Sequence, residues 1–433
     1  MARRPAGRVA DVPPRAQAKL GASLPRARGG AAPSVDGGRG GRVPAYRAYA
    51  RRSVRAASGS RAGAARGAAR MTMALVGFGT AVPEHALTQE EAVELHSTLC
   101  EIDLNRSRTL RALYRRSGVS RRHSVLLDKS CGPLLGRQTF YPPARDDADE
   151  GPTTAHRMER YEAHAPALAT TAAASALHAA GLRGGEVTHV VTVSCTGFVA
   201  PGTDTRVIEA LGLPPTTQRT HVGFMGCHAA LNALRVADSL VSADPAAVVL
   251  VCSVELCSLH FAYGWNPEML VPNALFADGA AAVVGRAAPG NGSDWRIASS
   301  ATLLIPDSGG DMSWRIGDHG FRMTLSARVP DLVAGGLGDW LRGWLGANGL
   351  DLGDVGSWAV HPGGPRILGA VERAAGLTPD QTRVSRGVLA DFGNMSSATV
   401  LFTLDRLRSE GAPGPCVALA LGPGLVAEAM LIV

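Results

Sequence analysis

Few of the features that mark membrane, secreted or zinc-binding proteins occur in this sequence. Its 433 residues contain no apolar run of 18 or more residues, the length expected of a transmembrane helix. The N-terminal region lacks the apolar core of a secretory signal. The seven cysteines follow neither a CxxC nor a Cys/His zinc spacing. We therefore expect a cytoplasmic protein with reduced thiols, no membrane partner and no metal.

Lysine is nearly absent, and the basic residues are unevenly distributed. Of the 44 Lys and Arg residues, 16 lie in residues 1–70 beside two acids, and the other 28 share residues 71–433 with 35 acids. The net charge of +7 therefore arises in the first segment, and the remainder carries a charge of −7. An acidic globular part gives no reason to expect a nucleic-acid partner.

Residues 1–70 consist mostly of Arg, Ala, Gly and Pro. Such a composition buries too little apolar surface to offset the entropy lost on ordering. We predict a disordered extension or a start codon assigned too early, with a transit peptide or a basic arm as alternatives. Met71 and Met73 directly precede the first strand-like run, which favours the first interpretation.

Beyond residue 70, strand-like and helical patterns alternate, which predicts an α/β layered fold with buried, largely parallel sheets. A loop at 288–294, rich in Pro, Gly, Asn and Ser, predicts a boundary between halves at 71–287 and 288–433. Strands are predicted over 74–79, 187–195, 246–256, 279–284, 357–361, 416–420 and 426–433, and helices over 161–181, 204–211, 229–243, 329–350, 365–377 and 396–410.

One cysteine, Cys227, stands where chemistry is expected. It ends the segment THVGFMGC and immediately precedes a predicted helix with an apolar stripe. The unpaired N–H groups and the dipole of a helix N-terminus favour a thiolate, and Gly226 allows a sharp turn. Considered alone, a cysteine at a helix start is more often an inert core thiol.

His361 and Asn394 complete a candidate catalytic set. His361 follows the apolar strand SWAV and opens a PGGP loop, the end of a strand at which α/β folds place reactive groups. Asn394 lies in DFGNMSSAT, just before a predicted helix. A structural histidine and an ordinary N-cap are the alternatives for these two residues. Together, the histidine can stabilise a thiolate and the asparagine can polarise a thioester carbonyl or its enolate.

Five segments carry a family resemblance. GFMGCHAALNALRVA, ALFADGAAAVV, WAVHPGGPRIL, FGNMSSATVLF and ALGPGL occur here in the order found in type III polyketide synthases, the chalcone and stilbene synthase family. HPGGP with GNMSSA separates this family from its thiolase-fold relatives. The sequence resembles the family over about residues 73–433, and SCTGF with ELCSL resembles its bacterial members.

The resemblance implies a five-layered αβαβα thiolase-like fold of two similar halves, working as a homodimer. Cys227 would accept the starter acyl group from an acyl-CoA. His361 and Asn394 would bind malonyl-CoA, promote its decarboxylation and stabilise the enolate. Repeated decarboxylative Claisen condensation and cyclisation would then give a pyrone or a phenolic product. Coenzyme A thioesters are the substrates, and no bound cofactor is implied.

The same resemblance assigns the walls of a substrate cavity. Phe276 matches the first of two gatekeeper phenylalanines, and the second falls on Met323, which is longer and more flexible. A position that controls cavity volume, usually Gly, falls on Trp314. We therefore expect few extensions, and malonyl or aliphatic starters in preference to p-coumaroyl-CoA. Positions that are often Thr in plant enzymes are Cys195, Cys257 and His260.

Further positions match structural parts of the cavity. Glu255 and Ser396 match a hydrogen-bonded set that directs cyclisation through a water in stilbene-forming relatives. Cys195 takes the third place in that set, where a thiol donates only weakly. For Glu255, a buried carboxylate paired with backbone donors is the alternative. Gly422 and Gly424 match the Gly/Pro loop that scaffolds the cavity.

A basic helix is expected to hold the phosphates of coenzyme A, with a solvated basic face as the alternative. One family Arg position falls on Ala112. The candidates in NRSRTLRALYRRSGVSRRH are Arg106, Arg108, Arg111, Arg115 and Arg116.

Two other functions stay open at this level. A ketoacyl synthase of the initiating type, acting with an acyl carrier protein, would share the Cys, His and Asn. A thiolase-fold scaffold that binds acyl-CoA without catalysis is the other, although intact Cys227, His361 and Asn394 argue against it. Repeated extension from malonyl-CoA without carrier protein would distinguish the polyketide synthase.

Overall fold

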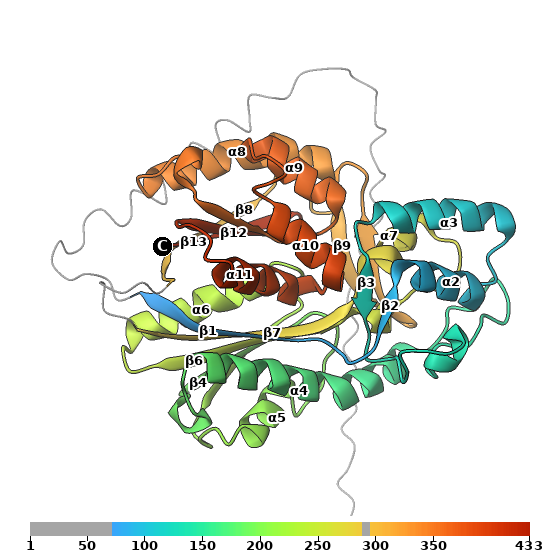
Figure 1. Ribbon diagram of the computed structural model, residues 1–433, viewed down its shortest axis with the longest axis horizontal. Coiled ribbons are helices and arrows are strands. Elements are labelled where there is room, and N and C mark those ends of the chain that lie inside the picture. The colour runs from blue at the N-terminus through green and yellow to red at the C-terminus, as the bar shows by residue number, and fades with distance from the viewer. Residues whose placement is uncertain (1–71, 288–294) are drawn as a thin grey trace, which may run out of the picture. The chain divides into compact units, whose positions relative to one another are not determined.

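Layers of helices and strands alternate through the part of the chain that the computed structural model describes, residues 72–287 and 295–433 (Figure 1). The predicted extension at 1–70 and the boundary loop at 288–294 lie outside the described residues. None of the helices within these ranges combines the length and the apolar composition that a bilayer-spanning segment requires.

The first sheet forms the centre of the N-terminal half, with the order β1-β7-β6-β4-β5. β4 pairs in parallel with β5 and β6, whereas β7 pairs antiparallel with β1 and β6. The sheet is therefore mixed, and the expectation of largely parallel sheets is wrong. Its strands are β1 (Met73–Ala81), β4 (His189–Ser194), β5 (Gln218–Gly223), β6 (Val248–Leu256) and β7 (Asp278–Ala287).

The second sheet repeats this plan in the C-terminal half, with the order β11-β12-β13-β8. Only β11 and β12 are parallel, because a short chain reversal joins β12 to β13 as an antiparallel pair. The strands are β8 (Ile297–Leu304), β11 (Ser357–Val360), β12 (Cys416–Gly422) and β13 (Val426–Ile432).

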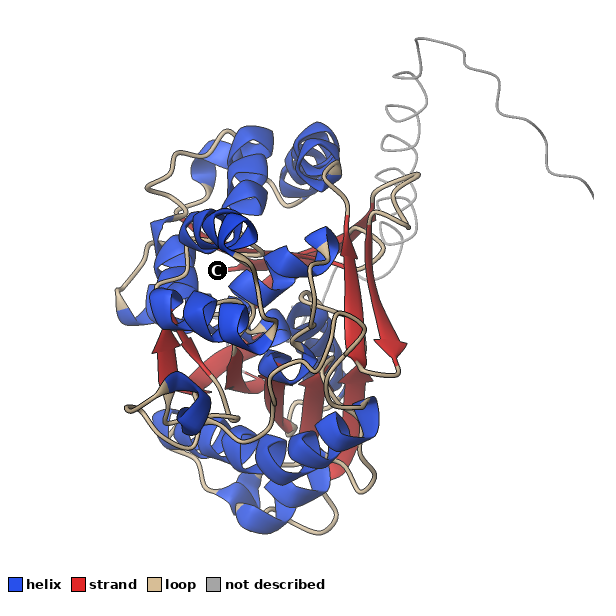
Figure 2. Cartoon of the chain, turned by 90° about the vertical axis from the view of Figure 1, so that its right-hand side faces the viewer, coloured by secondary structure: helices blue, strands red, loops and turns tan. Residues whose placement is uncertain are grey.

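The helices cover both sheets and fill the space between them, as both views show (Figures 1 and 2). α6 and α11 contact both sheets, α4 and α5 pack on the first sheet, and α8 and α9 share a core with the second. This gives five layers, as predicted. The helices are α2 (Gln89–Leu99), α3 (Leu104–Arg116), α4 (Thr154–Ala179), α5 (Thr203–Ala210), α6 (Ala229–Ala243), α7 (Pro267–Leu275), α8 (Val329–Ala347), α9 (Pro365–Ala375), α10 (Arg383–Phe392) and α11 (Thr399–Ser409).

Alternate side chains of β12 contribute to two different hydrophobic cores. Successive side chains point to opposite faces of a sheet. Cys416 and Ala418 accordingly join the core around α6 and α11, where small residues let the helices approach closely. Val417 and Leu419 join the core beneath α8 and α9. Both faces are apolar because both are covered by helices.

Two short strand pairs lie outside the main sheets, and sequence analysis did not predict them. β2 (Ala86–Thr88) pairs with β3 (Arg121–His123), and β9 (Met312–Gly317) forms a hairpin with β10 (Gly320–Leu325). Their mixed polar and apolar composition gives no strong strand pattern. Each is held by its partner strand and by contacts with distant segments.

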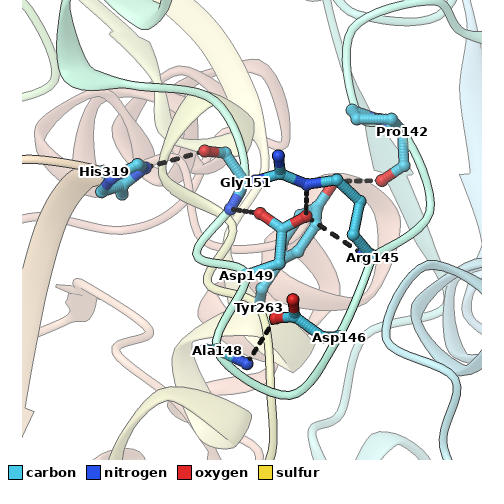
Figure 3. A network of polar contacts seen from close by, with 8 residues as sticks. All are labelled: Pro142, Arg145, Asp146, Ala148, Asp149, Gly151, Tyr263 and His319. Carbon is cyan, nitrogen blue, oxygen red and sulfur yellow. Dashed lines mark hydrogen bonds and ion pairs between the residues drawn. The ribbon is translucent and has the colours of Figure 1, made fainter.

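Loop 142–151 helps to fix the β9–β10 turn (Figure 3). His319 in that turn and the backbone oxygen of Gly151 form a hydrogen bond of 2.7 Å through Nδ1. Asp149 accepts from the side chain of Arg145 at 2.8 Å and from the backbone N–H of Gly151 at 3.0 Å. These donors hold the pKa of Asp149 well below its usual range. The hydroxyl of Tyr263 closes the other end of the loop by donating to Pro142.

Candidate active site

Cys227 lies at a sharp turn between β5 and α6. Phe224 and Gly226 both have left-handed backbones, with φ of 58° and 86°. Gly226 is required here, because a Cβ at that position would lie 2.1 Å from Cδ of Pro423. The backbone N–H of Gly226 donates to Sγ of Cys195 at 3.0 Å. The predicted strand-to-helix elbow is therefore present, with Cys227 directly before the first cap residue of α6.

Backbone hydrogen bonds bring His361 and Asn394 to the same place from the C-terminal half. His361 extends the pairing of β11 by donating its N–H to the oxygen of Leu419 at 2.7 Å. Asn394 exchanges hydrogen bonds with the segment around Phe276: its N–H donates to Leu275, and its oxygen accepts from the residue after Phe276. This link crosses from one half of the molecule to the other.

The three predicted catalytic side chains, Cys227, His361 and Asn394, line one cavity of about 40 Å³, together with Phe276 and Met323. An adjoining space of about 20 Å³ shares the walls of Cys227, Phe276 and Met323. Its further walls include Cys195, Cys257, Trp314 and Ser396. We call these two spaces together the Cys227 cavity.

Burial determines the pKa values of the ionisable side chains that line the Cys227 cavity. Burial raises the pKa of Cys227 to about 12, against the opposing effect of the Ser396 hydroxyl, which lies 3.6 Å from Sγ. Burial and the neighbouring His228 lower the pKa of His361 to about 3. Burial therefore opposes the effect expected of the helix N-terminus on the Cys227 pKa. The pair begins as a thiol and a neutral imidazole.

His361 and Asn394 both keep polar groups available. Within the described ranges, neither ring nitrogen of His361 has a hydrogen-bond partner. Oδ1 of Asn394 accepts the backbone N–H of Ser396 at 2.9 Å, which fixes the amide so that its own N–H donors face elsewhere. Both side chains are almost fully buried, with 1% and 2% of their surface exposed. Unpaired buried nitrogens such as those of His361 are rare, and a ligand or a catalytic role explains them.

The set expected around Glu255 differs from the one observed. Glu255 is buried and accepts from the backbone N–H of Cys195 at 2.9 Å, from the hydroxyl of Thr196 at 2.8 Å and from the hydroxyl of Ser397. Ser396 instead donates to Cys227. Glu255 binds the backbone of Cys195, whose thiol donates to the oxygen of Gly226 at 3.6 Å. The alternative of a buried carboxylate with backbone donors fits this arrangement, and burial raises the pKa of Glu255 to about 7.

His260 lines a neighbouring cavity, which shares the walls of Cys257, Phe276 and Trp314 with the Cys227 cavity. Its Nδ1 accepts from the N–H of Phe321 at 3.0 Å, and its Nε2 therefore donates to the oxygen of Thr196 at 2.8 Å. The ring also stacks on Phe321 with centroids 4.1 Å apart. His260 faces a second cavity, which Cys257 also borders.

Trp314 and Met323 are direct cross-strand partners in the β9–β10 hairpin. Both line the Cys227 cavity, which agrees with the positions expected from the family resemblance. Nε1 of Trp314 donates to the backbone oxygen of Cys195 at 2.8 Å, which fixes the indole across the cavity. Met312, two residues before Trp314 on the same face of β9, is a further wall residue that the sequence analysis missed. Predicting this strand would have revealed it, because alternate residues share a face.

The loop Gly422–Gly424 packs against the turn that carries Cys227. A Cβ on Gly422 would lie 2.5 Å from the ring of His228, so Gly422 makes room for the residue that follows Cys227. Gly424 has a left-handed backbone with φ of 77°. The scaffolding role expected of this loop therefore has a structural cause, and only Pro423 reaches the cavity wall. His228 itself was not singled out by the sequence analysis.

A larger cavity of about 510 Å³ adjoins the Cys227 cavity and shares the walls of Val271 and Leu275 with it. We call it the entrance cavity. Of the predicted basic residues on α3, Arg116 lines it, on the helix face that also carries Ala112. Arg366, in the segment HPGGPR, is a second cation on its wall, and the sequence analysis missed it. The remaining predicted arginines are exposed and are not among its walls: Arg106, Arg108, Arg111 and Arg115.

The five-layered fold, with a cysteine, a histidine and an asparagine around one buried cavity, defines a thiolase-like condensing enzyme. The comparisons with known proteins identify its family. Residues 56–289 match the N-terminal domain of chalcone and stilbene synthases, and residues 296–433 match the C-terminal domain. The chain belongs to the chalcone and stilbene synthase family and is a type III polyketide synthase, an acyltransferase. The predicted family is thereby confirmed.

Relatives of known activity and a solved structure agree with this assignment. The chain is 36% identical to 1,3,6,8-tetrahydroxynaphthalene synthase of Streptomyces peucetius subsp. caesius, over 82% of this chain and 91% of the relative. It is 32% identical to the alpha-pyrone synthesis polyketide synthase-like Pks18 of Mycobacterium tuberculosis, over 83% and 91%. The crystal structure of PKS-I from the brown alga Ectocarpus siliculosus matches with a TM-score of 0.78 and 29% identity, over 85% and 99%.

Proposed function

We propose that Cys227 carries the acyl intermediate of this polyketide synthase and that His361 and Asn394 activate malonyl-CoA. The observation that supports this assignment is the convergence of a thiol, an unpartnered imidazole and an available amide on one buried cavity. Cys227 is the one cysteine of the described residues that lines the same 40 Å³ space as His361 and Asn394, whereas Cys195 and Cys257 line the adjoining space.

The first half of the reaction loads the starter. The thiol proton of Cys227 passes to the imidazole of His361, so that the two charges form together as an ion pair. The thiolate attacks the thioester carbonyl of acyl-CoA, and the coenzyme A thiolate leaves with the proton from His361. Because both groups line the same buried cavity, the attraction between the two charges offsets part of the desolvation that disfavours either charge alone.

The second half extends the chain. Malonyl-CoA binds with its thioester carbonyl at His361 and Asn394, loses carbon dioxide and becomes an enolate. N–H donors at the carbonyl oxygen stabilise that negative charge in a site shielded from water. The enolate carbon attacks the acyl-Cys227 carbonyl and expels the thiolate, and the lengthened chain can be loaded again. A pyrone or phenolic product is consistent with the products named in the relatives. We propose malonyl or aliphatic starters for this enzyme.

We also propose that coenzyme A enters through the entrance cavity, with its phosphates held by Arg116 and Arg366. Arginine binds phosphate through several N–H donors at once. Arg116→Ala should therefore raise KM for malonyl-CoA about tenfold with a smaller effect on kcat. Arg183→Ala is the control, since this exposed arginine is paired with Glu186 away from both cavities.

The catalytic assignment is tested by Cys227→Ala. Alanine should leave the protein folded, abolish acyl loading from radiolabelled acyl-CoA and abolish polyketide formation. Cys252→Ala is the matched control, because Cys252 is a fully buried thiol in the core on β6. Cys227→Gln should retain decarboxylation of malonyl-CoA through His361 and Asn394. Chain extension by the folded Cys227→Ala variant would overturn the proposal.

A further inference from the structure

The outer face of α3 carries basic residues that the proposed mechanism does not use. Helix α3 packs on α2 and α7 at the edge of the molecule (Figure 1). Leu104, Arg108, Arg111 and Arg115 follow one another at intervals of four, three and four residues, which places them on one side of an α-helix. All four are exposed, and Leu104 has 86% of its surface accessible. We call these four residues the outer stripe.

The positive charge of the outer stripe is not neutralised by neighbouring acids. Within residues 72–287 and 295–433, none of its three arginines forms an ion pair. Arg106 on the same helix differs, because it pairs with Asp103 at 3.4 Å and lies over the ring of Trp265. Helix α3 contains no acidic residue, although residues 71–433 as a whole carry 35 acids against 28 bases. The outer stripe is therefore a basic patch on an acidic protein.

The outer stripe borders the opening of the entrance cavity. Thr109, Ala112 and Arg116 of α3 line that cavity. Each of them directly follows an arginine of the outer stripe in the sequence, and successive residues of an α-helix are turned by about 100°. Thr109 and Arg116 are themselves exposed, so the cavity opens to solvent beside the stripe. A ligand that enters the cavity there passes the three unpaired arginines.

The entrance cavity itself holds few cations for a nucleotide. Arg116 and Arg366 line it, together with the acidic Glu268. Coenzyme A ends in a nucleotide that carries further phosphates, whereas a phosphopantetheine arm attached to a protein carries a single phosphodiester. Most of the charge on α3 lies outside the cavity, where it can meet the surface of a protein that bears such an arm.

We propose that the outer stripe docks a small acidic carrier protein, whose phosphopantetheine arm delivers the starter acyl group through the entrance cavity to Cys227. The partner presents carboxylates to the three arginines and an apolar side chain to Leu104. Complementary charge speeds the encounter and fixes the orientation of the partner, which a tethered substrate needs because its arm must enter at one place. Malonyl-CoA uses the same cavity without a protein partner. The inference rests on the proposed role of Cys227.

The transfer exchanges one thioester for another. The thiolate of Cys227 attacks the carbonyl carbon of the acyl-phosphopantetheine thioester, and the carbon–sulfur bond to the arm breaks. The sulfur of the arm takes up the proton that His361 received from Cys227. The carrier protein then leaves with a free thiol, and the acyl group remains on Cys227.

The test measures the rate at which the full-length chain is acylated on Cys227, by intact-protein mass spectrometry without malonyl-CoA. The two donors are hexanoyl-CoA and a hexanoyl group on the acyl carrier protein of bacterial fatty acid synthesis, a small acidic protein. Arg108→Gln, Arg111→Gln and Arg115→Gln are combined in one variant. Its rate with the carrier protein should fall about tenfold, because each exposed ion pair contributes a factor of about two to three. Its rate with hexanoyl-CoA should change by less than about twofold, since salt screens charges outside the cavity.

A matched control combines Arg183→Gln, Arg206→Gln and Arg342→Gln. These arginines are exposed and line neither cavity, and their replacement removes the same amount of charge. The control should leave both rates near wild type. Because the two donors are compared within each variant, a partial loss of folded enzyme cancels from the ratio of the rates. Added salt should lower the wild-type rate with the carrier protein more than the rate with hexanoyl-CoA.

Three outcomes would overturn the inference and leave the proposed function intact. The first is a wild-type enzyme that hexanoyl-CoA acylates and the hexanoyl carrier protein does not. The second is an equal loss with both donors in the outer-stripe variant, because the stripe would then act on coenzyme A itself. The third is binding to phosphatidylglycerol vesicles that the variant loses while its ratio of rates stays unchanged, which would assign the stripe to a membrane surface. Failure of both donors to acylate the wild-type enzyme would overturn the proposed function as well.

Discussion

The buried carboxylate of Glu255 should make the stability of this protein depend on pH in a defined direction. Burial raises its pKa to about 7 from an ordinary value of 4.5. Below pH 4.5 the group is protonated in both the folded and the unfolded chain. As the pH rises towards 7, the unfolded chain releases the proton and the folded chain keeps it, so the free energy of unfolding falls with rising pH.

The magnitude follows from the difference between the two pKa values. At 1.36 kcal/mol per pKa unit, the loss is about 3 kcal/mol once the pH exceeds 7. About 2 kcal/mol of this falls between roughly pH 5.5 and pH 8.5, where urea unfolding can be followed by circular dichroism. Glu255→Gln should lack this loss, because an amide does not titrate.

Glutamine can keep most of the hydrogen bonds around Glu255. Its oxygen can accept from Cys195 N–H and the Thr196 hydroxyl, and its NH2 group can donate to Ser397, which then donates to Ser253. The measured quantity is how the difference in free energy of unfolding between Glu255→Gln and wild type changes with pH. A difference that is the same at every pH therefore does not affect the result. Glu94→Gln, an exposed site on α2, is the control and should follow the wild-type curve. Parallel curves for wild type and Glu255→Gln would refute the reasoning.

Three further outcomes are expected. Gly226→Ala should lower turnover more than tenfold, because the backbone is left-handed and the added Cβ would meet Pro423. The control Gly264→Ala, at a similar φ but with open space around it, should leave turnover near wild type. Equal effects of the two substitutions on turnover would contradict this. His361→Gln should slow the alkylation of Cys227 by iodoacetamide at neutral pH at least tenfold, because a thiol with a pKa of about 12 then lacks a proton acceptor. An unchanged alkylation rate would exclude the proposed proton transfer. Product analysis by mass spectrometry should show malonyl or aliphatic starters used ahead of p-coumaroyl-CoA, and the reverse order would reject that preference.

The sequence by itself determined the family and the layered architecture. Apolar runs of β-branched residues and helical stripes are local patterns, and they located most strands and helices of both sheets. The segments around Cys227, His361 and Asn394 are local in the same sense, because each motif needs its own backbone turn. These could be read without knowing what lies opposite them in space.

The tertiary structure decided everything that depends on residues from different segments. Strand direction within the sheets is set by pairing across the chain, which is why a mixed sheet replaced the expected parallel one. The pKa of Cys227 depends on how completely the fold removes the thiol from water, which is set by packing between distant segments. Two neighbouring serines have different partners for the same reason: Ser397 donates a hydrogen bond to Glu255, and Ser396 donates one to Cys227.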